Sequence, residues 1–371
     1  MSVGVLRGST AARSDSAQLT AGMRRRTHVW TTCLLLAVVV SAVLCIGIGP
    51  ADIDPVTVLA IIGHHVGLPL DGALNGVQLW TPAQDAIVWG LRTPRVLLGL
   101  AVGAALAICG AALQAMVRNV LADPYVLGIS SGASTGAAGA ILFGYAAGAG
   151  QYALPVSAFI GALLASLLVF ALARTNGQVT SVRLLLSGIA IGYALSAATS
   201  FLIFMSDDVA GARSVMFWML GSLTLARWGA LLALVFIVVV LSAGFMYLWA
   251  PRLDALTAGD ETARTLGVRP DTTRIQLLLV VSLCTGLAVA ASGAIGFVGL
   301  VVPHLGRRMV GAAHARLIPV TALLGAVLLV WADALARVLM EPRELPIGII
   351  TALVGAPFLI VLIRRMTAQR A

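Results

Sequence analysis

Long apolar runs separated by short polar segments make up most of the chain after residue 28. A helix needs about 20 predominantly apolar residues to cross the hydrocarbon core of a bilayer. Ten runs reach or approach this length, and we predict that each crosses a membrane as a helix. The predicted spans are Val29–Ile48, Pro94–Met116, Tyr125–Ala147, Leu154–Ala173, Leu184–Met205, Gly229–Leu248, Ile275–Ala291, Ile295–Val310, Leu317–Leu339 and Ile347–Ile363. The seventh and eighth are short and only three residues separate them, so their ends are defined least sharply.

The overall composition agrees with this pattern. Of the 371 residues, 60% are hydrophobic, whereas soluble domains are about 45–50% apolar even with Gly counted. The expected fold class is therefore an all-α, polytopic membrane protein with ten transmembrane helices and cytoplasmic N- and C-termini.

The charges predict the orientation. All 24 basic residues are Arg; with a cytoplasmic N-terminus and alternating spans, 18 of them lie inside and six outside. The acids divide the other way, with six inside and nine outside. Cytoplasmic loops collect positive charge, so this bias supports both the orientation and the span count, and it requires no nucleic-acid partner. The chain then divides into a disordered basic cytoplasmic tail (1–28), a transmembrane domain (29–365) and a short cytoplasmic tail (366–371).

Several kinds of chemistry are excluded by what the sequence lacks. A Walker A loop needs a lysine and the chain has none, so it does not hydrolyse ATP through a P-loop. The four cysteines lie within apolar runs, without the spacing of metal ligands, and are interpreted as small apolar side chains. They are Cys33, Cys45, Cys109 and Cys284. With no HExxH motif either, the sequence predicts no enzyme activity, catalytic residue, metal site or cofactor.

One polar segment between two spans needs an explanation. Pro251–Arg274 holds four Arg and four acids in 24 residues, and we predict that it is cytoplasmic. Gly259 interrupts the segment, Asp260 can cap a short helix, and Gly267 can end it. An isolated helix needs about 12–15 residues to be stable in water, so this one has to pack on the membrane domain or on a partner. The alternative is a plain solvated loop.

Small residues recur in the second and third spans. Gly99 and Gly103 are four residues apart, and so are Gly128, Gly132 and Gly136. On a helix this spacing makes a smooth face that lets two backbones approach closely. Tight packing within the membrane domain is the expected role of most of these glycines.

Four longer motifs go beyond composition. They are LRTPRVL at 91–97 with the run that follows it to Ala133, GDETARTLG at 259–267, GAIGFVGLVVPH at 293–304, and ELPIG at 344–348 with GAPF at 355–358. In order and spacing they resemble the FecCD-type family, the permease subunits of ABC importers for iron–siderophores, haem and vitamin B12. The resemblance runs from about Leu91 to Arg364 and is specific for the family but not for the substrate.

The resemblance implies a ten-helix permease in the cell inner membrane, working as a homodimer or as a heterodimer with a related permease. Two cytoplasmic ABC ATPase subunits would drive it, and a periplasmic or lipid-anchored binding protein would deliver the substrate. In that family the polar insert between spans six and seven carries a coupling helix that sits in a cleft on the ATPase, here Asp260–Leu266. The implied ATPase-coupling residues are Asp260, Glu261, Ala263, Arg264, Leu266 and Gly267.

The resemblance also implies a docking site for the binding protein at Arg92, Arg95 and Arg337. An arginine presents a rigid donor fork that matches a carboxylate. The alternative is internal pairing, since Asp333 lies four residues before Arg337 and can share its helix face.

A cytoplasmic gate is implied at Asn119, Leu121, Thr180 and Ser181, where a small polar ring with an apolar constriction can close. Asn119 and Thr180 also suit local roles at a helix C-terminus and a helix N-cap, which could coexist with gating. The substrate path of the family corresponds to Leu184–Met205, Ser206–Phe217 and Ile347–Ile363.

The expected function is import of a ferric siderophore by alternating access, driven by partner ATPases. Import of haem or vitamin B12 by the same kind of permease is the first alternative, and the adjacent His64 and His65 are a weak signal for haem. A secondary transporter driven by an ion gradient is a remote alternative. It would need ionisable residues deep in the spans, and none lies near a predicted span centre.

Overall fold

The computed structural model describes residues 4–68, 80–175 and 178–368, and most of them are helical. The elements are α1 (Gly4–Gly47), α2 (Pro55–Val66), α3 (Pro82–Asp85), η1 (Ala86–Arg92), α4 (Thr93–Val117), η2 (Pro124–Leu127), α5 (Ile129–Phe143), η3 (Ala147–Tyr152), α6 (Ala153–Ala173), β1 (Arg174–Thr175), β2 (Gln178–Val179), α7 (Ser181–Phe204), α8 (Val209–Met219), α9 (Ala230–Leu248), α10 (Ala250–Ala258), α11 (Asp260–Thr265), α12 (Pro270–Ser292), α13 (Val298–Val310), α14 (His314–Val338) and α15 (Ile347–Ala368). The two short strands pair antiparallel. The predicted all-α class is confirmed.

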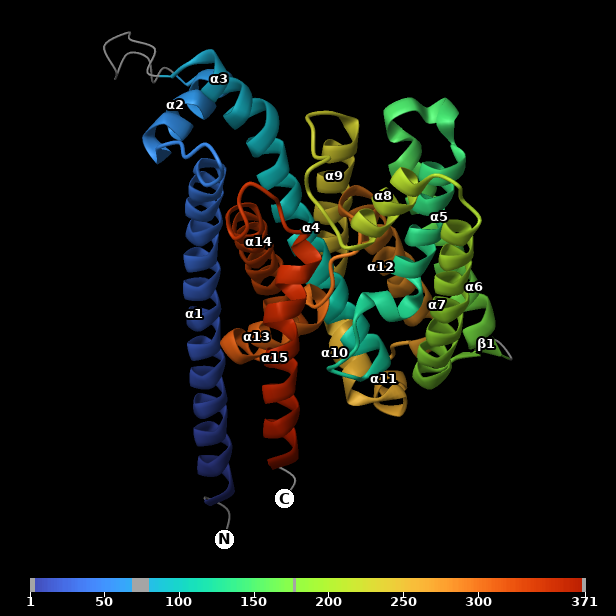
Figure 1. Ribbon diagram of the computed structural model, residues 1–371. Helices are drawn as coiled ribbons and strands as arrows, with labels where there is room; N and C mark the ends of the chain where they lie inside the picture. The colour runs from blue at the N-terminus through green and yellow to red at the C-terminus, as the bar shows by residue number, and fades with distance from the viewer. Residues whose placement is uncertain (1–3, 69–79, 176–177, 369–371) are drawn as a thin grey trace.

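The long helices run between two ends of one bundle (Figure 1). The start of α1, the last turns of α15 and the pair α10 and α11 lie at one end, and α2 and α3 lie at the other. We call the first the inner end and the second the outer end. The charge bias predicts that the inner end faces the cytoplasm.

Within the described ranges, eight helices are long and apolar enough to cross a membrane, and they match eight of the ten predicted spans. The other two predictions coincide with shorter helices, α5 with 15 residues and α13 with 13. The third span was predicted from Tyr125, but Asp123 caps the turn η2 and Gly128 takes a left-handed backbone, so α5 begins only at Ile129. The eighth begins late because Phe297 has a positive φ. The count of ten is thus approximate.

The N-terminal helix is longer than the sequence suggested. A disordered tail was predicted over 1–28, whereas α1 begins at Gly4. The stretch lacks an apolar period, which motivated the prediction, but it contains no Pro and is rich in Ala and Arg, which have high helix propensity. Further along α1, Arg26 donates to the carbonyl of Arg308 at 3.0 Å, which ties the helix to α13.

The core is built around α4, which is buried along almost its whole length. Close packing depends on glycine. A Cβ added at Gly103 would overlap the backbone of Gly325 in α14, and one at Gly132 in α5 would overlap that of Gly161 in α6. The predicted small-residue faces therefore do bring backbones together at these two positions. Gly99 differs, since the nearest atoms to an added Cβ there would belong to the side chains of Leu223 and Val330.

Candidate functional site

The predicted coupling segment folds as two short helices at the inner end rather than one. α10 precedes α11, and Gly259 separates them with a φ of +114°. The sequence predicted Asp260 as the N-cap of the second helix. That detail is wrong: Gly259 occupies the cap position, and Asp260 is the first helical residue, with its carboxylate directed to an arginine instead.

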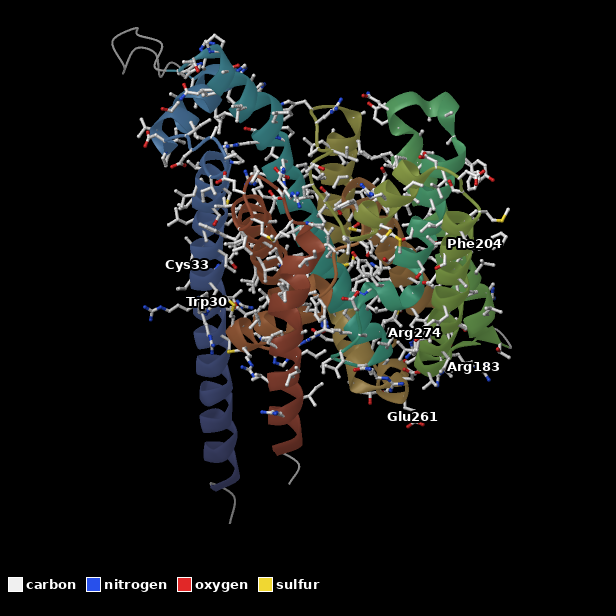
Figure 2. All side chains as sticks on the ribbon, viewed as in Figure 1. Trp30, Cys33, Arg183, Phe204, Glu261 and Arg274 are labelled. Carbon is white, nitrogen blue, oxygen red and sulfur yellow. The ribbon has the colours of Figure 1, made fainter. Side chains whose placement is uncertain are left out.

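The two faces of α11 differ in exposure. Ala263 is completely buried, and Asp260 points towards the membrane domain. Glu261 and Arg264 are exposed, and Leu266, which follows the helix, is 66% exposed. A short helix that leaves a large apolar side chain and two charges in solvent has a surface on which a partner can pack. Figure 2 shows Glu261 at the inner end, pointing away from the bundle.

Gly267 ends the helix, as predicted. Its φ is +77°, a left-handed conformation that favours glycine. Its N–H donates to the carbonyl of Arg264, and the next N–H, of Val268, donates to the carbonyl of Ala263. These bonds satisfy the last carbonyls of the helix in the manner of a Schellman motif.

Asp260 anchors α11 to the membrane domain through Arg274, in the second turn of α12. Arg274 Nη2 donates to Asp260 Oδ1 at 2.7 Å, and Nη1 donates to Oδ2 at 3.0 Å. Arg118 Nη2 lies 3.6 Å from the same carboxylate. Above all, the hydrogen bonds from Arg274 lower the pKa of the Asp260 carboxyl below its ordinary value, so the pair is charged at neutral pH.

A second anchor holds α10. Asp254 Oδ1 accepts a hydrogen bond from the backbone N–H of His314 at 3.0 Å and lies 2.6 Å from His314 Nδ1. His314 is buried at the start of α14. The coupling segment is therefore fixed to two different helices of the bundle, α12 and α14, rather than hanging as a loop.

The four predicted gate residues lie at the inner ends of α4 and α7. Asn119 Oδ1 accepts from the N–H of Leu121 at 2.9 Å, so Asn119 has the local turn role that the sequence also suggested. Ser181 Oγ donates to the carbonyl of Met116 at 3.3 Å, which joins the start of α7 to the end of α4. Thr180 occupies the N-cap position of α7, but within the described chain its exposed side chain makes no capping hydrogen bond.

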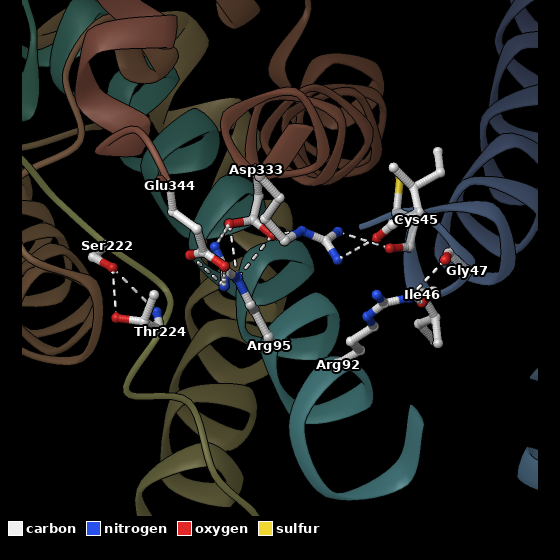
Figure 3. A network of polar contacts seen from close by, with 11 residues as sticks. Cys45, Ile46, Gly47, Arg92, Arg95, Ser222, Thr224, Asp333 and Glu344 are labelled. Atoms are coloured by element: carbon white, nitrogen blue, oxygen red, sulfur yellow. Dashed lines mark hydrogen bonds and ion pairs between the residues drawn. The ribbon is translucent and has the colours of Figure 1, made fainter. Parts of the chain in front are cut away.

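At the outer end, Arg95 lies between two acids (Figure 3). Its Nε and Nη2 donate to Asp333 Oδ1 at 3.0 and 2.9 Å, and its Nη1 donates to Glu344 Oε2 at 2.9 Å. The Asp333 side chain is 2% exposed, that of Arg95 12% and that of Glu344 36%. Arg95 thus joins α4 to α14 and to the loop before α15, and only its contact with Glu344 is open to solvent.

Arg92 and Arg337 are buried and used internally. Both guanidinium groups donate to backbone carbonyls where α1 ends and the next loop begins, over distances of 2.6 to 3.0 Å. The acceptors are the carbonyls of Cys45, Ile46, Gly47, Ile48 and Ala51. Arg337 Nε also lies 3.2 Å from Asp333 Oδ2, in an ion pair without hydrogen-bond geometry. The expected docking role needs guanidinium groups that face outward, and these two do not.

Among residues 4–68, 80–175 and 178–368, no group of three or more His, Cys, Asp or Glu side chains is arranged to hold a metal ion. At both ends of the bundle, the charged side chains described above join one helix to another.

Comparison with known proteins identifies the family. The model of the FecCD transport family matches residues 34–365. This chain belongs to the FecCD family. Among its relatives, a cobalamin import system permease of Halobacterium salinarum is 46% identical over 78% of this chain and 76% of that protein. A hemin transport system permease of Yersinia pestis is 43% identical over 81% of this chain and 90% of that protein.

Two further comparisons agree. A ferric enterobactin transport system permease of Escherichia coli is 38% identical over 84% of this chain and 92% of that protein. An inward-facing structure described as a metal-chelate type ABC transporter superposes with a TM-score of 0.77 and 32% identity, covering 90% of this chain and 98% of the other. This FecCD protein is a multi-pass membrane permease of an ABC importer, and it works with ATPase and substrate-binding partners.

Sequence reasoning missed the side chains that hold the permease's sites together. Arg274 had been counted only as the end of the polar segment, although an arginine at the edge of an apolar span is costly and calls for a partner. Gln114 lies in the run that follows the LRTPRVL motif, and no role was predicted for it from the sequence. Its Nε2 donates to three backbone carbonyls, and its Oε1 accepts from Arg307 at 2.6 Å. A polar side chain in an apolar run was the available signal in both cases.

Proposed function

We propose that this permease imports a ferric siderophore across the cytoplasmic membrane by alternating access. Two copies, or this chain and a related permease, would enclose the path, with one ATPase subunit under each. ATP binding would bring the ATPases together and move the coupling helices. Haem and cobalamin are the alternative substrates, since relatives of both kinds are similar to this chain.

The observation that carries the proposed substrate class, a metal already wrapped by a chelator, is the exposed face of α7. Tyr193, Ser196, Ser200 and Phe204 are all exposed and lie on one side of this helix. Between residues 193 and 204, all described, the only ionisable side chain is the Tyr193 phenol. Hydroxyl groups among apolar side chains can contact the polar rim of a bulky chelate that already wraps its metal, without holding it tightly. A bare cation would find no carboxylate there.

The signal for haem is weaker in three dimensions than in sequence. His65 Nε2 lies 3.1 Å from Asp85 Oδ1, and its ring stacks on Trp89 with centroids 4.4 Å apart. His64 packs edge-on against Trp80. Both histidines therefore join α2 to neighbouring elements, and this structural role accounts for their presence without haem.

For the inner end, we propose that Glu261, Arg264 and Leu266 contact the ATPase, whereas Asp260 and Ala263 hold the helix in place. Gly267 ends the helix. Asn119, Leu121, Thr180 and Ser181 would form the gate, with the bond from Ser181 to Met116 joining its two sides.

Substrate choice can be tested in vesicles. Proteoliposomes that hold the permease, its ATPase and its binding protein should accumulate a radiolabelled ferric siderophore when ATP is supplied to the ATPase side. Labelled haem and labelled cobalamin serve as parallel probes in the same vesicles. Uptake of either one without siderophore uptake would overturn the substrate assignment. Uptake driven by an ion gradient, with the ATPase omitted, would overturn the ATP-driven scheme proposed here.

For docking, we propose that Arg95 receives an acidic residue of the binding protein in place of Glu344. Glu344 is the half-exposed partner, and an incoming carboxylate would compete with it for the same guanidinium nitrogen. The substitution Glu344→Gln should therefore tighten the complex with the binding protein, since an exposed pair contributes about 0.2–1 kcal/mol. The dissociation constant measured in nanodiscs should fall by up to about fivefold.

The matched control for this substitution is Glu341→Gln, which removes an exposed acid from the same loop. Both variants change the net charge equally, so long-range attraction changes equally. An equal gain in affinity from both would show that charge, rather than release of Arg95, is responsible.

A further inference from the structure

We propose that Arg274 carries movement of α11 to the inner ends of α4 and α7, taking α11, as in the proposed function, to be the helix that meets the ATPase. The exposed face of α11 explains how a partner can push on the helix. It does not explain how the push reaches the helices that close the path.

On the coupling side, the connection is a two-point contact. Both carboxylate oxygens of Asp260 accept from separate nitrogens of Arg274, at 2.7 and 3.0 Å. Two parallel bonds between a planar guanidinium and a carboxylate fix orientation as well as distance. A displacement of the first turn of α11 is therefore passed to the Arg274 side chain as a whole.

On the gate side, the same guanidinium contacts the backbone of two other elements. Its Nε donates to the carbonyl of Met116, in the last turn of α4, at 3.3 Å. Its Nη1 donates to the carbonyl of Val179, in β2, at 3.3 Å. Asp271, in the first turn of α12, accepts from the N–H of Val179 at 3.3 Å. Both backbone groups of Val179 are thus held by α12.

These two acceptors lie shortly before the predicted gate residues in the chain. Met116 lies just before the turn that contains Asn119 and Leu121, and it also accepts from Ser181. Val179 immediately precedes Thr180, the N-cap residue of α7. One side chain therefore contacts the proposed coupling helix and the backbone shortly before both pairs of predicted gate residues.

A purely structural role does not account well for an arginine at this position. Arg274 is only 2% exposed, and burying a charge costs several kcal/mol of desolvation before any contact is made. Apolar residues of similar volume often replace buried ion pairs without loss of stability. A link between three elements needs what arginine provides, a rigid fork with donors in several directions.

The test follows two distances in the complete complex of permease and ATPase in nanodiscs. One spin-label pair is placed at Thr262→Cys in the two copies of α11, and another at Val182→Cys in the two copies of α7. The exposed native cysteine is removed by Cys33→Ser. With the native Arg274, a non-hydrolysable ATP analogue should shift both distances.

In the Arg274→Gln variant, the α11 distance should still shift and the α7 distance should not. ATP hydrolysis should continue while substrate taken up per ATP falls by about tenfold or more. Arg174→Gln, the same change at an exposed arginine in β1, should behave like the native chain. If Arg274→Gln does not fold, Arg274→Lys replaces it, because one ammonium cannot make all four bonds.

The outcomes separate the two proposals. An α7 distance that follows the analogue in the Arg274 variant as it does in the native complex overturns the role of Arg274 and leaves the coupling function intact. An α11 distance that ignores the analogue in the native complex overturns the coupling function and the role of Arg274 with it. A structural role alone would lower the yield of folded protein without dissociating the two movements.

Discussion

Replacing Glu261 and Arg264 together by alanine should abolish ATP-driven uptake while leaving the permease folded and inserted. Both side chains are exposed on α11, whereas the anchors of the helix, Asp260 and Ala263, are untouched. Truncating two contacts in an interface, each worth about 1–2 kcal/mol, weakens the complex on the order of 100-fold. The fold should not change, since surface substitutions usually alter stability by less than about 0.5 kcal/mol.

Two measurements check this result. The ATPase should no longer copurify with the double variant, and uptake into proteoliposomes should disappear, while the amount of permease in the membrane stays at the native level. Arg174→Ala, at another exposed arginine near the inner end, should retain both properties. Native uptake by the double variant would refute the assignment of α11 as the coupling helix.

The sequence predicted the short helix α11 because the signals for it are local. Glycines on both sides of a charged stretch mark the ends of a short helix whatever surrounds it. It could not predict which face turns inward, since that depends on Arg274, and the sequence offers several arginines in the same segment. The misplaced cap has the same origin: Asp260 is suited to capping by local rules, but a buried arginine takes its carboxylate.

The membrane spans were also predicted where the signal is local and missed where it is not. Runs of about 20 apolar residues identify membrane helices reliably, and eight of the ten were found this way. The errors lie where the backbone breaks inside an apolar stretch. Phe297 has a φ of +69°, and this positive value delays α13. Its ring packs where a side chain at Gly355 of α15 would be, a long-range fit that no local pattern reveals.

The contacts of the outer arginines could not be predicted from the sequence. The sequence identified Arg92, Arg95 and Arg337 as a set, and it offered Asp333 as an internal partner for Arg337 only. In the structure Asp333 serves Arg95 as well, from a position 238 residues away in sequence. Such a contact arises only when α4 and α14 pack against each other, and for that reason the sequence could not separate docking from internal pairing.

Removing the charge of Asp333 should be among the most destabilising single changes in the permease. In Asp333→Asn, Arg95 would keep Glu344 as an acidic partner, whereas Arg337 would be left with its contacts to backbone carbonyls. Breaking a buried ion pair from one side costs about 3–5 kcal/mol because a buried charge is left uncompensated. The free energy of unfolding, measured in detergent micelles, should fall by this amount.

Two comparisons make the cause of that loss testable. Glu344→Gln removes the half-exposed acid on the same arginine, and such a pair contributes less than about 1 kcal/mol, so this variant should stay near the native stability. Adding Arg337→Gln to Asp333→Asn removes one unpaired buried charge and should recover part of the loss. Equal destabilisation by Asp333→Asn and Glu344→Gln, or a double variant less stable than Asp333→Asn alone, would contradict the idea that buried charge balance holds α4 and α14 together. The recovery follows from the ion pair itself, because a guanidinium that has lost its carboxylate is more costly to bury than the neutral amide of Gln.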